Sequence, residues 1–166
     1  MKAKTLRRLL KEESLVYMPS AYYALGGRLV EDLGYKAVYI GGFVTGGSRC
    51  ASEPLLTMDE QVRVAGDVAS AVKIPAVADG GAGFGEPLHT MRTVREFIRA
   101  GVSGIHIEDQ LYPKRAHYHK YIAHAIPREE LSPRSNMPAS PATRQTKISS
   151  SSRAPTLAAS RDWKRR

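Results

Sequence analysis

Short apolar runs alternate with longer segments of helical periodicity through the first 131 residues of the chain. Four such runs are found, at residues 15–18, 37–40, 74–78 and 104–107. Each is short enough for a strand, and turn residues follow it before the next helical pattern begins. The alternation predicts about four consecutive units of one β-strand and one α-helix.

Two of the predicted helices have clear boundaries. Thr57 can cap the N-terminus of one helix, and Glu60 stands three residues later, where it completes a capping box. Pro87 suits the first turn of the next helix, and Gly101 marks its end. These signals predict well-defined helices after the second and third strands.

The apolar runs also indicate how the strands are arranged. A strand as continuously apolar as residues 75–78 is buried on both faces, which is the condition of a parallel sheet covered by helices. An α/β fold is therefore predicted, either an open doubly wound sheet or part of a (β/α)8 barrel. Both architectures place functional residues at the C-terminal ends of the strands.

The composition changes after Leu131. Residues 132–166 hold eight serines and four prolines, show no apolar periodicity, and carry eight Lys or Arg residues against a single acid. They therefore contribute +7 of the net charge of +9. Such a segment buries too little apolar surface to offset its conformational entropy. We predict one domain at residues 1–131 and a disordered basic tail at residues 132–166.

The sequence disfavours membrane, secreted and zinc-binding proteins. No apolar run reaches the roughly 18 residues of a membrane span, and Glu12 and Glu13 interrupt the basic N-terminal segment before any signal-like stretch. The single cysteine, Cys50, can form neither an intramolecular disulfide nor a multi-cysteine zinc site. We therefore expect a cytoplasmic protein.

Two predicted strands end in carboxylates. Asp79 ends the third strand, and Glu108 follows the fourth. Because neighbouring parallel strands lie about 4.8 Å apart, both carboxylates can reach one hard divalent cation, for which Mg2+ is the natural candidate. Alternatively, Asp79 caps the following turn, and Glu108 pairs with a nearby Lys or Arg.

Glycines follow two of the strand ends. Residues 80–85 do not match the G-x-G-x-x-G spacing of dinucleotide-binding loops. They favour a loop that adopts positive φ or lets its backbone approach a ligand, and Gly41 and Gly42 after the second strand invite the same interpretation. Exposed amides there could hold a carboxylate.

The segment that follows Glu108 is rich in cationic and proton-transferring side chains, which is typical of a mobile active-site loop. Lys114 is the best candidate within it, because a cation can stabilise negative charge that develops on a substrate. A solvated run of charges is the alternative. His117 and His119 are more often surface residues than metal ligands, since no third ligand is marked.

Three stretches resemble a known superfamily, at residues 18–42, 55–85 and 94–119. Their order, and GIHIEDQ followed by PKR in particular, is similar to the isocitrate lyase and phosphoenolpyruvate mutase superfamily. The resemblance spans residues 14–131 and implies the first half of a (β/α)8 barrel. Full-length relatives are expected to be homo-oligomers.

The resemblance also implies a chemistry and roles for individual residues. It implies Mg2+ bound by Asp79 and Glu108, and a small α-oxycarboxylate substrate whose C–C or P–C bond is cleaved or formed through an enolate. The implied catalytic residues are Lys114, Arg115 and His117. The implied substrate-binding residues are Tyr39, Gly41, Gly42 and Asp79.

The chain departs from the family pattern at the site. The usual D-x-D reads Asp79-Gly80-Gly81, and a further family aspartate aligns with Ser52, next to Glu53. The lyase loop K-[KR]-C-G-H has alanine in place of its cysteine, at residues 114–118. Isocitrate-type cleavage is therefore disfavoured, and decarboxylase-like or phosphonomutase-like chemistry is favoured.

Four further βα units of the family do not follow residue 131. We therefore expect a truncated relative of low activity, because half of a barrel leaves an open sheet edge. The alternative function is a non-catalytic fragment whose basic tail binds a polyanion. No recognised nucleic-acid motif accompanies that tail, so a nucleic-acid partner is disfavoured.

Overall fold

The computed structural model describes residues 2–114 and 125–127. The helices of the described part are α1 (Lys2–Glu12), α2 (Ala24–Asp32), α3 (Gly42–Ser48), the short 3-10 helix η1 (Glu53–Leu55), α4 (Met58–Ala71) and α5 (Pro87–Arg99). The strands are β1 (Val38–Ile40), β2 (Ala76–Asp79) and β3 (Gly104–His106). The predicted tail at residues 132–166 lies outside the described residues and stays a prediction.

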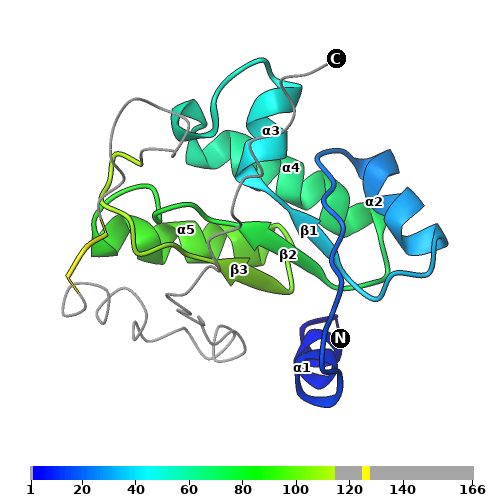
Figure 1. The fold of residues 1–166 in the computed structure, drawn as a ribbon. Coiled ribbons are helices and arrows are strands. Elements are labelled where there is room, and N and C mark those ends of the chain that lie inside the picture. Colours follow the sequence, from blue (N-terminus) through cyan, green and yellow to red (C-terminus); the bar gives the residue numbers. More distant parts are fainter. Residues whose placement is uncertain (1, 115–124, 128–166) are drawn as a thin grey trace, which may run out of the picture.

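The strands form a parallel sheet in the order β1-β2-β3 (Figure 1). Tyr39 pairs with Val77, and Asp79 pairs with His106, so the strands end at one edge. The predicted α/β class, parallel pairing and sequential order are confirmed for these three strands.

The first expected strand, at residues 15–18, is wrong. The described segment instead makes one isolated parallel bridge, between Ser20 and Tyr39. Pro19 has no N–H for a ladder, and the side chains of Leu15 and Tyr17 are 62% and 69% exposed, so little burial stabilises a strand there. The bridge still places the segment beside β1, on the side away from β2.

Helices α4 and α5 cover one face of the sheet, and α2 packs beside α4 (Figure 1). The core between them contains alternate residues of the strands, such as Ile40 and Ala78, together with Val68 of α4 and Phe97 of α5. Burying each of the larger side chains stabilises the fold by roughly 1.5–3 kcal/mol. The core therefore holds the strand ends in fixed positions.

Both predicted helix boundaries are confirmed. The Thr57 hydroxyl accepts a hydrogen bond from the Glu60 amide, and the Glu60 carboxylate accepts one from the Thr57 amide at 2.8 Å. Pro87 begins α5, and Gly101 follows its end with φ of 87°. The capping box fixes the start of α4 close to the carboxyl edge of the sheet.

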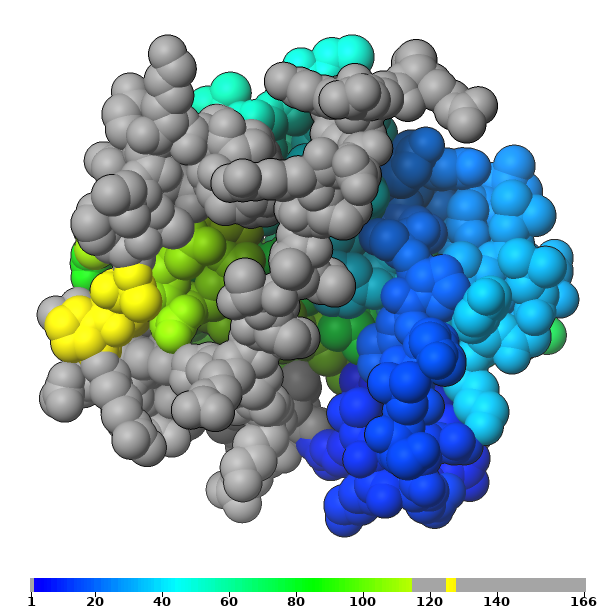
Figure 2. Space-filling model, in the orientation of Figure 1, coloured from blue at the N-terminus to red at the C-terminus, as the bar shows by residue number. Residues whose placement is uncertain are grey.

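Helix α1 was not predicted. It buries Leu6 and Leu9, and the Lys2 ammonium donates a 2.7 Å hydrogen bond to the carbonyl of Ala69 at the end of α4. In the space-filling view, its dark blue surface adjoins the segment that leads to α2 (Figure 2). Within residues 2–114 and 125–127, no helix is long and apolar enough to cross a membrane.

Candidate metal centre

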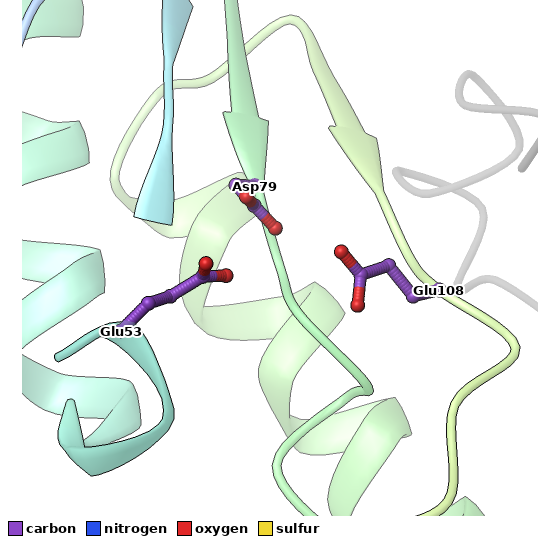
Figure 3. A group of neighbouring side chains, drawn as sticks. All are labelled: Glu53, Asp79 and Glu108. Atoms are coloured by element: carbon purple, nitrogen blue, oxygen red, sulfur yellow. The ribbon is translucent and has the colours of Figure 1, made fainter. Parts of the chain in front are cut away.

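Three carboxylates meet at the carboxyl edge of the sheet (Figure 3). Asp79 is the last residue of β2, Glu108 follows β3, and Glu53 comes from η1. One oxygen of each lies within 4.8 Å of the others. The convergence of Asp79 and Glu108 was expected from the parallel strands, and their role as metal ligands stays a prediction.

Hydrogen bonds fix the Asp79 carboxylate, which is only 8% exposed. The Gly42 amide donates to its Oδ2 at 3.1 Å, and the Gly81 amide donates to its Oδ1 at 2.8 Å. Each carboxylate oxygen is thus held by one backbone amide. The Gly42 amide, which was predicted to hold substrate, is thus engaged by Asp79 in this structure.

Glu53 reaches the site because Gly42 has no side chain. A Cβ at position 42 would lie 2.6 Å from Glu53 Oε1, too close for any real contact. Burial raises the pKa of the Glu53 carboxyl, and the charges of Asp79 and Glu108 raise it further, while its bond to Lys114 opposes them. The ionised form of Glu53 is therefore held at a cost in stability.

Lys114 lies among these acids. Its ammonium forms ion pairs with Glu53 and with Glu108, the latter at 2.9 Å. Burial alone would lower the pKa of Lys114, but the surrounding carboxylates outweigh it, so the pKa is raised. The alternative interpretation of Glu108 as an ion-pair partner is therefore correct in geometry, and it coexists with the acidic cluster.

Two acceptor oxygens at the site have no hydrogen-bond partner among the described residues, namely Gln61 Oε1 and Glu108 Oε2. Gln61 is 2% exposed, and its Nε2 donates to the Asp79 carbonyl at 3.3 Å, which fixes the orientation of its amide. The adjoining cavity has a volume of about 30 Å³. Because hard divalent cations take oxygen ligands and retained waters, these donors fit Mg2+.

Tyr39 of β1 faces the same site. Burial raises the pKa of its hydroxyl far above the usual range, and the nearby carboxylates, Asp79 foremost, raise it further. A hydrogen bond with Asp79 acts in the same direction. The hydroxyl therefore stays protonated and remains a neutral hydrogen-bond donor.

The glycine-rich loop after β2 has the backbone that was expected of it. Gly81, Gly83 and Gly85 all have positive φ, at 52°, 84° and 142°. Gly41 differs, because its φ is −81°. Its neighbour Gly42 allows the close approach of the Glu53 side chain. The predicted catalytic residues Arg115 and His117 lie outside the described residues.

Sequence reasoning missed Glu53 and Gln61 as members of the site. Glu53 had one available signal, its position beside Ser52, with which the family resemblance aligned an aspartate. Gln61 had none, because it lies on the buried side of α4, where a glutamine at helical spacing has no special mark. Both residues belong to the site because the folded chain brings η1 and α4 next to the end of β2.

Comparison with known families identifies the chain. The sequence model of the family described as phosphoenolpyruvate phosphomutase matches residues 6–133. The chain belongs to this family. The predicted membership of the isocitrate lyase and phosphoenolpyruvate mutase superfamily is thereby confirmed.

Known relatives of the family match a large part of the chain. The 2,3-dimethylmalate lyase of Eubacterium barkeri is 36% identical over 132 residues, which are 78% of this chain and 44% of that relative. The crystal structure of phosphoenolpyruvate phosphomutase from Streptomyces platensis subsp. rosaceus matches with a TM-score of 0.79 and 30% identity, over 86% of this chain and 52% of that one.

A third match was solved with ligands. It is phosphonopyruvate hydrolase in complex with oxalate and Mg2+, with a TM-score of 0.75 and 25% identity, over 86% of this chain and 50% of that one. The chain thus spans about half the length of these solved structures. Its α/β fold with a parallel sheet matches that of the TIM-barrel superfamily.

Proposed function

We propose that this chain binds Mg2+ at Glu53, Asp79 and Glu108 and, together with the ion, a small α-oxycarboxylate. The observation that carries the proposal is the approach of three carboxylate oxygens within 4.8 Å of one another at the strand ends. The complex of phosphonopyruvate hydrolase with oxalate and Mg2+ supports the pairing of such a ligand with this cation. The sheet would then be the first half of a (β/α)8 barrel.

Each residue has a distinct task in this proposal. Asp79 is held by two amides and would present fixed oxygens to the ion. Tyr39 would donate its hydroxyl proton as a hydrogen bond to a substrate oxygen, because that hydroxyl stays protonated. Lys114 would place positive charge beside the substrate. When bound, Mg2+ would supply the charge that stabilises a developing enolate oxygen.

Cleavage or formation of a C–C or P–C bond follows from this chemistry. In a decarboxylation of oxaloacetate, the C–C bond to the leaving carboxylate breaks, and carbon dioxide departs. The electron pair of that bond forms the enolate of pyruvate, which then takes a proton. A phosphonomutase-like reaction would use the same enolate. Isocitrate-type cleavage is disfavoured, because Ala116 stands where the lyase loop has its cysteine.

Calorimetric titration of oxalate into the full 166-residue chain tests this function. Oxalate should bind in the presence of Mg2+ and fail to bind without it. The variant Asp79→Asn should lose the Mg2+-dependent binding, and Asp67→Asn, on the exposed side of α4, should retain it. Oxalate binding that is independent of Mg2+, or absent at millimolar oxalate with Mg2+, would refute the proposal.

A further inference from the structure

The Lys114 ammonium occupies the space between the acids of the metal centre. It contacts Glu53 Oε1 and Glu108 Oε1, and the Lys114 side chain is only 10% exposed. Among the described residues, Lys114 is the one cation that pairs with these acids. The Lys114 ammonium thus lies where a cation bound by Glu53 and Glu108 would lie.

One ammonium satisfies the cluster incompletely. When all groups are ionised, three carboxylates face a single positive charge. Glu108 Oε2 and the buried Gln61 Oε1 still have no hydrogen-bond partner in the described part of the chain. An ammonium offers three donors, whereas a divalent cation carries twice the charge and takes six or more oxygens with its waters. The unsatisfied oxygens therefore point to a stronger cation.

The two cations compete for the same carboxylates. A metal ion held by Glu53 and Glu108 would lie beside the Lys114 ammonium, which contacts Oε1 of both residues. The repulsion between the ammonium and a divalent ion would also be strong in this partly buried site.

We infer that Lys114 is the built-in counter-ion of this site, and that a divalent cation binds only as the ammonium leaves Glu53 and Glu108. The inference rests on the proposed function. Lys114 holds the two glutamates together in the metal-free chain. Metal binding then frees the ammonium at the moment when a substrate's negative charge is brought to the site.

The affinity for Mn2+ tests the inference, because Mn2+ accepts the same oxygen ligands as Mg2+ and its free form is counted by electron paramagnetic resonance. The full chain is compared with Lys114→Met, which keeps the length of the side chain and removes its charge. Lys36→Met is the matched control, since Lys36 pairs with Glu13 on the surface. Lys114→Met should bind Mn2+ at least tenfold more tightly, and Lys36→Met should bind it like the wild type.

The outcomes separate this inference from the proposed function. Equal or weaker binding of Mn2+ by a folded Lys114→Met variant would overturn the counter-ion role and leave the metal site standing. If neither the wild type nor the variant binds Mn2+, the proposed function itself fails, and the inference fails with it. Circular dichroism shows whether the variant is folded.

A second measurement uses the wild-type chain alone, so it does not depend on the folding of a variant. The rate at which the Lys114 amine is acetylated is followed by mass spectrometry with and without Mn2+. Displacement from the carboxylates should accelerate acetylation of Lys114 and leave the rate at Lys36 unchanged. An unchanged rate at Lys114 under saturating Mn2+ would overturn the inference.

Discussion

The helix-covered face of the sheet and its carboxyl edge contrast in composition. On the covered face, Val68 and Phe97 are fully buried among apolar side chains, and close packing fixes their positions. At the carboxyl edge, Glu53, Asp79 and Glu108 bring three acids together in a partly buried space. Such an arrangement costs stability unless a cation compensates it. The covered face therefore stabilises the fold, whereas the edge is suited to binding.

The largest effect is expected on the covered face. Phe97→Ala should lower the free energy of unfolding by about 3–5 kcal/mol, because it leaves a cavity in a packed core. Urea denaturation measures the loss. Mn2+ affinity of the folded protein should change little, since Phe97 lies in the apolar core and does not line the pocket at the acids. A small loss of stability with a large loss of Mn2+ affinity would contradict the assignment of the covered face to stability and of the carboxyl edge to binding.

A substitution at the edge should act mainly on binding. Gly42→Ala brings a methyl group to 2.6 Å from Glu53 Oε1, so the carboxylate must move. Mn2+ affinity should fall by about tenfold or more, as when the support of a metal ligand is lost. Paramagnetic resonance titration gives the affinity.

Gly47→Ala, in the same helix α3, is the control for this substitution. A Cβ there meets no atom within 4 Å. It should leave the affinity unchanged and stabilise the helix by roughly 0.5–1 kcal/mol. Equal effects of the two substitutions on Mn2+ affinity would contradict the close approach of Glu53.

The capping box lies only four residues beyond Glu53, and it sharpens the contrast. Thr57→Ala should lower the free energy of unfolding by about 1 kcal/mol through loss of the N-cap. Mn2+ affinity should stay as in the wild type. Thermal and urea denaturation check the first result, and a marked loss of affinity would show that the edge depends on the helix cap.

The smallest effect is a difference in pH dependence between two glutamates. Hydrogen bonds from Thr57 lower the pKa of Glu60 below the ordinary 4.5, so its contribution to stability is present above the unfolded pKa and is lost as pH falls. Burial raises the pKa of Glu53 above 4.5, so its contribution is complete below the unfolded pKa and is lost as pH rises through the folded pKa.

Urea denaturation at a series of pH values on both sides of the ordinary glutamate pKa of 4.5 measures the free energy of unfolding. It compares the wild type with Glu60→Gln and Glu53→Gln. As the pH rises, the wild type should become more stable relative to Glu60→Gln and less stable relative to Glu53→Gln. Slopes of the same sign for both residues would contradict the assigned environments.

Much of the fold follows from local sequence signals. The strands β1, β2 and β3 are short apolar runs, and the caps of α4 and α5 depend on residues within one helical turn. The convergence of Asp79 and Glu108 follows because parallel strands end at one edge. These features need no knowledge of distant contacts.

The features that sequence reasoning missed depend on distant contacts. Glu53 belongs to the site only because η1 packs against Gly42, and its ion pair with Lys114 joins residues 61 positions apart. The expected strand at residues 15–18 failed for a local reason, the missing N–H of Pro19 beside exposed side chains. An apolar run alone did not reveal that lack of pairing.

Titration of Mn2+ into the full chain and into Glu53→Gln decides whether three carboxylates form one cation site, because Glu53 is the carboxylate that only the structure adds to the site. We predict one Mn2+ per wild-type chain, at least tenfold weaker binding by Glu53→Gln, and unchanged binding by Asp67→Asn. Binding by Glu53→Gln equal to that of the wild type, or no binding by the wild type, would contradict a cation site made of three carboxylates.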